Sequence, residues 1–263
     1  MLITEFGDKK VADYLDTGKY KKVLLIMNHG LGDAFMFYSN CYKALTERYP
    51  DIEFHYDTHL GQEDLFGHVD KNPEHYDIAF KFVFPCSEWD STDLTKSEKC
   101  MQVEIGLEPT GECYNIDNKF KSPLVGIHLN STCCPAMNVP VDFASRLWDQ
   151  IIYSGLIPID THMRHYFDNK HSVVYPFEQC RRVDNIPATL PKLMGLLGAC
   201  TGFAGVPSGN FFCALSLFPP EKILFLVSEF PANKITRLPV HELNWREGYN
   251  EQVVQNWLDC LKS

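Results

Sequence analysis

The feature that most constrains this chain is a pattern that occurs twice, a short and almost wholly apolar run that leads directly into a loop of small residues. The first run is KVLLIMN, residues 22–28, followed by the loop HGLGD. The second is LVGIHLN, residues 124–130, followed by a loop of Ser, Thr, Cys and Pro. Such runs are typical of parallel strands that are covered on both faces. The pattern therefore predicts two successive α/β units.

Strands and helices are expected to alternate within each unit. Phe37, Cys41, Leu45 and Tyr49 are spaced as one face of a helix, which Pro50 ends. A polar stretch at 108–123 separates the two units. The other expected elements are strands at 51–58, 76–84, 156–160, 200–206 and 223–227, and helices at 96–107, 143–152, 190–197, 209–217 and 253–261.

Composition excludes some classes of function and indicates the cellular compartment. Lys and Arg number 24 against 34 Asp and Glu, and the net charge of -10 argues against a protein that grips polyanions with its whole surface. The ten cysteines lack the spacing of a disulfide framework, so we expect reduced thiols and a cytoplasmic protein. The uncharged stretch 193–220 is broken by glycines and by Pro207, so no stable membrane span is expected.

The first loop is a candidate site. It consists of His29, Gly30, Leu31, Gly32 and Asp33. The two glycines are expected to allow a tight turn and close approach of a ligand, and the helix behind them offers N–H groups suited to an anion. Asp33 has two interpretations, an N-terminal cap or a general base. The third glycine of a dinucleotide fingerprint is missing.

Two further loops carry small polar groups at strand ends. Ser208 and the amides of Gly209 and Asn210 can hold a phosphate at a helix start, or Ser208 can simply cap that helix. Asn130, Ser131 and Thr132 follow the strand that opens the second unit, where they can contact a phosphate or sugar or form an ordinary turn.

Charged side chains elsewhere give weaker indications. Arg164 lies in a segment rich in His and Arg, and it can pair with a diphosphate or belong to a solvated face. His55, Asp57 and His59 alternate along a predicted strand and would share one face. A fourth ligand is not evident, so no metal site is expected.

Three segments of the chain together resemble the heptosyltransferase-like glycosyltransferases of family 9. KVLLIMNHGLGDAF is similar to the opening of that family. VGIHLNSTCCPAMNVPVDFASRLWDQII is similar to the opening of its second domain, and LPKLMGLLGACTGFAGVPSGNFFCALSLF to its late segment. The order and spacing of all three match, and they span most of the chain. The resemblance implies the α/β fold GT-B, in which two Rossmann-like domains with parallel sheets face each other across a cleft.

The resemblance also implies which parts of the chain bind the acceptor and which bind the donor. Residues 1–121 would form the N-terminal acceptor domain, 122–246 the C-terminal nucleotide-sugar donor domain, and 247–263 a closing helix that packs back on the N-terminal domain. Asp33 stands where the family has its proposed base, and Ser208, Gly209 and Asn210 stand where it cradles the donor diphosphate. The activity implied is inverting, metal-independent transfer of a sugar from a nucleotide diphosphate, without a cofactor, to a glycan or lipopolysaccharide-type acceptor.

Three departures from the family pattern keep alternatives open. Pro207 replaces an Asp, Phe212 occupies the region of a His, and Met137-Asn138 stands where a Lys is usual. A non-catalytic nucleotide-binding protein is therefore one alternative. The acceptor is open as well, so a second alternative is a sugar transferase that acts on hydroxymethylated bases of viral DNA, with a basic strip at 119–121 or 162–182.

Overall fold

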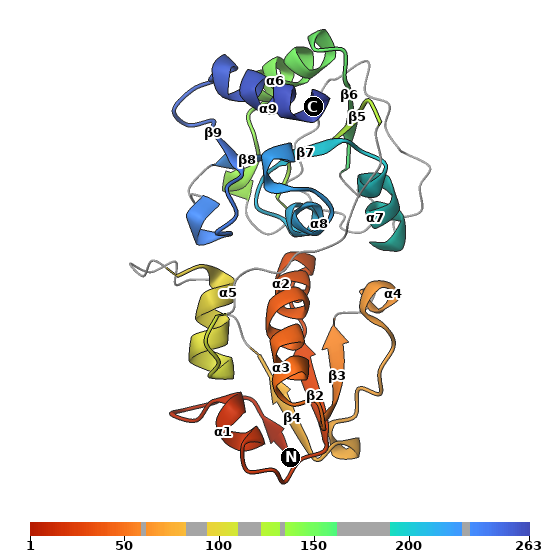
Figure 1. The fold of residues 1–263 in the computed structure, drawn as a ribbon, viewed down its shortest axis with the longest axis vertical. Helices are drawn as coiled ribbons and strands as arrows, with labels where there is room; N and C mark the ends of the chain where they lie inside the picture. The colour runs from red at the N-terminus through yellow and green to blue at the C-terminus, as the bar shows by residue number, and fades with distance from the viewer. Residues whose placement is uncertain (59–61, 83–93, 110–121, 132–134, 162–189, 228–231) are drawn as a thin grey trace. The chain divides into compact units, whose positions relative to one another are not determined.

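The chain divides into two compact units in the computed structural model, which describes residues 1–58, 62–82, 94–109, 122–131, 135–161, 190–227 and 232–263. Met1–Cys113 and Asn233–Arg237 form the first unit, and Tyr114–Ala232 and Leu238–Ser263 form the second. Each unit contains a parallel sheet with helices (Figure 1). The predicted α/β class, with two Rossmann-like units of parallel strands, is confirmed.

The first unit is built on β2 (Lys22–Met27), in which every residue after Lys22 is buried. In the described part of the chain its sheet has the order β1-β4-β2-β3, with all neighbours parallel. The other strands are β1 (Leu2–Ile3), β3 (Glu53–Thr58) and β4 (Ile78–Lys81). The chain passes from β2 to β3 on one side and returns to β4 on the other. The topological switch point therefore lies between β2 and β4.

One long helical run follows β2 in the first unit (Figure 1). It comprises α2 (Leu31–Met36), the π-helical η1 (Phe37–Tyr42) and α3 (Lys43–Arg48). Phe37, Cys41 and Leu45 are fully buried, which confirms the predicted face, and Tyr49 lies at the end of the helix. A second run, α5 (Lys96–Lys99) with the π-helical η3 (Cys100–Ile105), packs against η1. Shorter elements are α1 (Val11–Leu15), α4 (Glu63–Phe66) and the 3-10 turn η2 (Pro73–His75).

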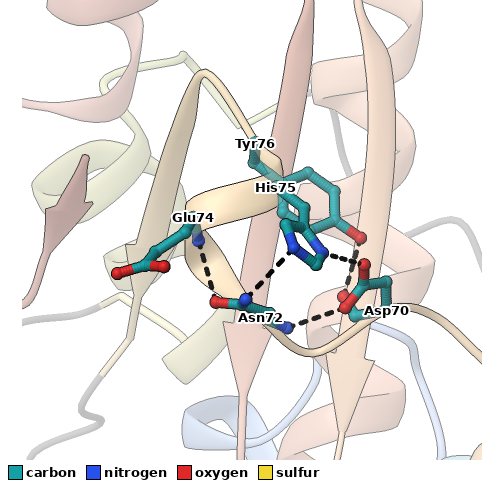
Figure 2. Close-up of polar contacts among 5 residues, drawn as sticks. All are labelled: Asp70, Asn72, Glu74, His75 and Tyr76. Carbon is teal, nitrogen blue, oxygen red and sulfur yellow. Dashed lines mark hydrogen bonds and ion pairs between the residues drawn. The ribbon is translucent and has the colours of Figure 1, made fainter.

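A polar cluster fixes the chain just before β4 (Figure 2). Asp70 accepts from the backbone N–H of Asn72 at 3.0 Å and pairs with His75 Nδ1 at 2.5 Å. Asn72 in turn caps η2 by accepting from Glu74 N at 3.1 Å, and the Tyr76 hydroxyl donates to Asp70 O at 2.7 Å. The cluster lies at the amino end of β4. It therefore orders the entry to a strand and lies away from the edge of the sheet where ligands bind.

The second unit has a sheet in the order β6-β5-β7-β8-β9 among the described residues, again with all neighbours parallel. Its strands are β5 (Leu124–His128), β6 (Ile157–Asp160), β7 (Gly202–Gly205), β8 (Ile223–Val227) and β9 (His241–Asn244). The chain leaves β5 for β6 on one side and returns to β7 on the other, so the switch point lies between β5 and β7.

The helices of this unit fall close to the predicted positions. They are α6 (Val141–Tyr153), α7 (Leu190–Gly198), α8 (Gly209–Leu217) and α9 (Glu251–Lys262), with the 3-10 turns η4 (Pro135–Met137), η5 (Pro220–Lys222) and η6 (Ala232–Lys234). The uncharged stretch 193–220 resolves into helix, strand, turn and helix, as predicted. Among the described residues, no helix combines the length and the apolar character needed to cross a membrane. The cysteines that the structure describes, Cys41, Cys100, Cys200, Cys213 and Cys260, are free thiols.

Helix α9 has its apolar face in the core of the second unit. Val254, Trp257 and Leu258 are fully buried there, and Trp257 Nε1 donates to Lys222 O at 3.1 Å. Gly202 in β7 leaves the space that the Leu261 side chain fills. The packing of 247–263 back on the N-terminal domain stays a prediction. Asn233–Arg237 lies within the predicted donor domain but clusters with the first unit.

Candidate functional site

The loop after β2 lies at the carboxyl edge of the first sheet, where it contacts the segments that follow β3 and β4. Ligands of open α/β sheets bind at this edge, at the switch point. The Nε2 atom of His29 lies 3.2 Å from Phe82 O, just beyond β4. The Gln62 side chain, beyond β3, donates to His29 O at 3.1 Å. His29 thus fastens the loop across the switch point between β2 and β4.

The backbone at Gly30 does not require the conformational freedom of glycine. It is the N-cap residue of α2, with φ -56°, which lies outside the left-handed region that favours glycine. A Cβ atom at this position would meet no other atom within 4 Å. Gly32 lies inside the first turn of α2. The glycine at the N-cap therefore leaves open space beside the loop.

Asp33 does not cap its helix, so that interpretation is wrong. The helix begins two residues earlier, at Leu31, and Asp33 occupies its first turn, where a carboxylate also interacts favourably with the helix dipole. Its carboxylate instead forms an ion pair with the ammonium group of Lys96 at the start of α5. The two side chains are 21% and 19% exposed, respectively. Asp33 is thus a charged, partly accessible group with a fixed partner.

The start of α5 is held from two directions. Thr95 Oγ1 accepts from Glu98 N at 3.2 Å, and Glu98 Oε2 accepts from Thr95 N at 2.8 Å, which completes a capping box. Arg237 binds the same carboxylate through Nη2 at 2.8 Å and through Nε at 3.1 Å. These hydrogen bonds lower the pKa of Glu98. Lys96 follows the cap directly, so its backbone position is well defined.

Further titratable groups lie near this ion pair. Burial raises the pKa of Glu104 to about 7, although a hydrogen bond from Cys100 and the charge of Lys96 act in the opposite direction. The Cys100 Sγ to Glu104 Oε2 distance is 3.6 Å. The Tyr56 hydroxyl donates to Ala34 O at 2.7 Å, and burial raises its pKa well above the usual value. Sequence reasoning missed Lys96, Glu104 and Arg237. The Thr-x-x-Glu capping signature at 95–98 was the available signal.

The carboxyl edge of the second sheet brings two of the predicted loops together. β5 and β7 are neighbours, and the residues that follow them are Asn130 and Ser131 on one side and Ser208 on the other. Asn130 and Ser131 are buried, and Ser131 N donates to Asn138 Oδ1 at 2.7 Å. Asn138 stands beside the buried Met137, where the family pattern has a Lys. In this chain its side chain holds the backbone of the loop.

Ser208 is the N-cap residue of α8, which begins at Gly209 as predicted. Its side chain makes no capping hydrogen bond. Within the described part of the chain, its buried Oγ atom has no hydrogen-bond partner at all. A buried hydroxyl without a partner is costly, and the first N–H groups of a helix have no acceptor within the helix. This arrangement fits a ligand that carries acceptor oxygens.

The side chain of Asn210 bonds to the protein itself. Its Nδ2 atom donates to Thr161 O at 2.9 Å and lies 3.2 Å from Thr161 Oγ1 and 3.1 Å from His128 Nδ1. Asn210, Thr161 and His128 are all buried. Asn210 therefore ties α8 to the ends of β5 and β6, a contact that sequence reasoning missed.

Thr132, Arg164 and His59 lie outside the described residues. His55 pairs with Glu53 at 2.6 Å, and Asp57 with Lys71 at 3.0 Å. No group of three metal-ligating side chains occurs among the residues that the structure describes.

Comparisons with known proteins address the fold. No family model and no curated protein sequence matches the chain. TibC, an iron-containing dodecameric glycosyltransferase from enterotoxigenic E. coli H10407, is 13% identical with a TM-score of 0.63. The match covers 85% of this chain and 64% of TibC, so the chain spans less than two thirds of that protein.

Two further solved structures have a similar fold. A family 9 glycosyltransferase from Veillonella parvula DSM 2008 is 13% identical with a TM-score of 0.56, over 92% of this chain and 98% of that chain. E. coli heptosyltransferase WaaC, solved with ADP, is 10% identical with a TM-score of 0.51, over 81% and 89%. At these identities the likeness concerns the fold. The chain therefore has the fold of the glycosyltransferases that its three sequence segments resemble.

Proposed function

We propose that this protein is a glycosyltransferase that moves a sugar from a nucleotide diphosphate donor to a hydroxyl group of a glycan or lipopolysaccharide-type acceptor. The observation that carries the proposal is the buried, unpartnered Ser208 hydroxyl at the start of α8. It lies at the switch point between β5 and β7, where open α/β sheets bind their ligands.

The donor diphosphate is assigned to the start of α8. Helix N-termini bind phosphate because their free N–H groups and the helix dipole both favour an anion. Gly209 and Asn210 supply such amides, and Ser208 supplies a hydroxyl donor. Asn130 and Ser131 lie on the neighbouring loop, and Thr132 and Arg164 remain predicted donor-binding residues. The similar fold of WaaC, which was solved with ADP, supports a nucleoside diphosphate as the ligand class.

The reaction is a single displacement. The acceptor oxygen forms a bond to the anomeric carbon while the bond from that carbon to the diphosphate oxygen breaks, and the electron pair leaves with the nucleoside diphosphate. The proton of the acceptor hydroxyl passes to the carboxylate of Asp33. Attack opposite the leaving group inverts the anomeric carbon. The donors at α8 stabilise the charge that develops on the diphosphate, and the proposal assigns no step to a metal or another cofactor.

The DNA alternative has no structural support. The basic segments on which it depended, 119–121 and 162–182, lie outside the described residues. Turnover of a nucleotide-sugar donor distinguishes the proposed enzyme from a non-catalytic nucleotide-binding protein.

Release of nucleoside diphosphate from ADP-, UDP-, GDP- and CDP-linked sugars tests the proposal. We expect turnover of at least one donor, and a loss of roughly 100-fold or more in Asp33→Asn, because a general base contributes about that much. Asp51→Asn, an exposed acid of the same unit, serves as the matched control and keeps full activity. Equal turnover in Asp33→Asn and wild type would remove Asp33 from the mechanism. Nucleotide binding without turnover of any donor would support a non-catalytic protein.

A further inference from the structure

Two helical runs of the first unit face each other with chemically matched side chains. Asp33, Phe37 and Cys41 recur every four residues on α2 and η1, and Lys96, Cys100 and Glu104 recur every four residues on α5 and η3. Elements η1 and η3 pack against each other, as do α5 and η1. Asp33 pairs with Lys96 at the end of this interface. The interface thus has the Asp33–Lys96 ion pair at one end, followed along the two helical runs by the buried thiols of Cys41 and Cys100 and the carboxyl group of Glu104.

We propose that Lys96 is a positioning residue for Asp33. Its ammonium group binds Oδ1 of the carboxylate, which fixes the orientation of the group and leaves Oδ2 to take the proton of the acceptor hydroxyl. This inference rests on the proposed function, because it assigns Lys96 a role in the proton transfer made by Asp33.

The geometry favours a defined role over an ordinary surface ion pair. Exposed pairs contribute little because two long side chains must be ordered in a high dielectric. Here about four fifths of each side chain is buried. The capping box of Thr95 and Glu98 fixes the residue before Lys96, and Arg237 binds the same Glu98 carboxylate from 139 positions along the chain. The ammonium group is therefore placed before any substrate arrives.

Other charged and titratable groups lie near the pair on the elements that pack against it. On β3, Tyr56 is the group whose hydroxyl pKa is raised, first by burial and also by the charge of Asp33. On η3, Glu104 is a second carboxyl group that senses the charge of Lys96. Cys41 and Cys100 complete the set on η1 and η3, and burial keeps the pKa of Cys100 high. Lys96 is the cation that both carboxyl groups share.

A double-mutant cycle with donor turnover as the readout tests the inference. In Lys96→Met we expect kcat to fall about tenfold to a hundredfold, because a misplaced catalytic group loses rates of this order. The KM for the donor should stay within about twofold, because a residue that positions the base acts on the chemical step and makes no contact assigned to donor binding. Lys96→Arg retains a cation and should recover most of the activity. Adding Lys96→Met to Asp33→Asn should cause no further loss.

A stability measurement and a control separate positioning from a structural defect. Loss of positioning should lower kcat at an unchanged KM and should be rescued by Lys96→Arg, whereas a purely structural defect would appear as a lower free energy of unfolding in urea that accounts for the lost activity. Lys43→Met, an exposed lysine on α3, makes the same charge change and should leave kcat unchanged.

Each contrary result has a distinct meaning. Full activity in Lys96→Met, with Asp33→Asn inactive, would overturn the inference and leave the proposed function standing. An additive loss in the double variant would show that Lys96 acts independently of Asp33 and would also overturn it. Full activity in Asp33→Asn, or no turnover of any nucleotide sugar by wild type, would overturn the proposed function and this inference together.

Discussion

Asn210 lies at the second position of α8, and its side chain holds the helix in place. Its amide nitrogen reaches acceptors on Thr161 and His128 at the ends of two strands. We expect Asn210→Ala to lower the free energy of unfolding by about 2–3 kcal/mol, because it leaves buried acceptors without a donor. Urea denaturation measures this. Asn256→Ala, an exposed asparagine of α9, is the control and should change stability by less than about 0.5 kcal/mol.

The same variant also tests the site. If the start of α8 binds the donor diphosphate, a displaced helix start should reduce the thermal stabilisation that ADP, UDP, GDP or CDP gives to the protein. Undiminished stabilisation by the bound nucleotide, together with lost stability, would confine Asn210 to a structural role.

The site residues that follow a strand were predictable from the sequence, whereas their partners were not. Ser208, Asn130 and His29 come directly after apolar runs, and the carboxyl ends of parallel strands are where ligands bind. Lys96 lies 63 positions from Asp33, and no local pattern signals a pairing over that distance. The capping interpretation of Asp33 was wrong because the helix begins earlier, at Leu31, with Gly30 as its N-cap.

At the level of elements, β7 and α9 meet at Gly202. A Cβ atom at this position would collide with the Leu261 side chain and lie 2.7 Å from Lys222 O. We expect Gly202→Ala to destabilise the protein by about 1–3 kcal/mol, because a backbone oxygen cannot give way as a side chain can. The free energy of unfolding in urea checks this.

A second glycine gives a control of opposite sign. A Cβ atom at Gly195, inside α7, would meet nothing within 4 Å. Gly195→Ala should therefore leave stability unchanged or raise it by up to about 1 kcal/mol, because alanine favours the helix. Equal effects of the two substitutions would contradict the close packing of β7 on α9.

Long elements with a clear pattern were predictable, and short ones depended on the sheet. The bounds of α8 and β8 agree with the sequence expectation, because each is a buried run limited by turn residues. The strand β1 has two residues, Leu2 and Ile3, and exists because it pairs with β4. Such a segment carries no periodicity of its own. Strand β9 is likewise stabilised by pairing with β8.

At the scale of the molecule, stability should respond to pH in two directions. Glu98 and the exposed Asp70 and Asp77 have lowered pKa values, so the stability they provide is lost as acid protonates them in the folded state. Glu104 acts oppositely. Its pKa is raised from 4.5 to about 7, so between those values the unfolded chain releases a proton that the folded protein keeps.

Stability should therefore fall as pH rises from about 4.5 to about 7, by on the order of 3 kcal/mol at most for this group. Glu104→Gln removes the group, and its unfolding free energy should change less between pH 5 and pH 8 than that of wild type. Urea denaturation at both pH values measures the difference, with Glu47→Gln as an exposed control. The same pH dependence in Glu104→Gln and wild type would show that another group is responsible.

The membership of Asn233–Arg237 in the first unit has a consequence for biosynthesis. The ribosome synthesises strands β1 to β4 of that unit long before it reaches Arg237. When these strands have been made, the Glu98 carboxylate therefore still lacks the guanidinium group that binds it in the folded protein. The contact that Arg237 makes with Glu98, at the start of the Lys96 helix, can therefore form only after residue 237 has been synthesised. A gene fragment that stops after Cys113 would encode a first unit without Asn233–Arg237 and therefore without the contact between Arg237 and Glu98.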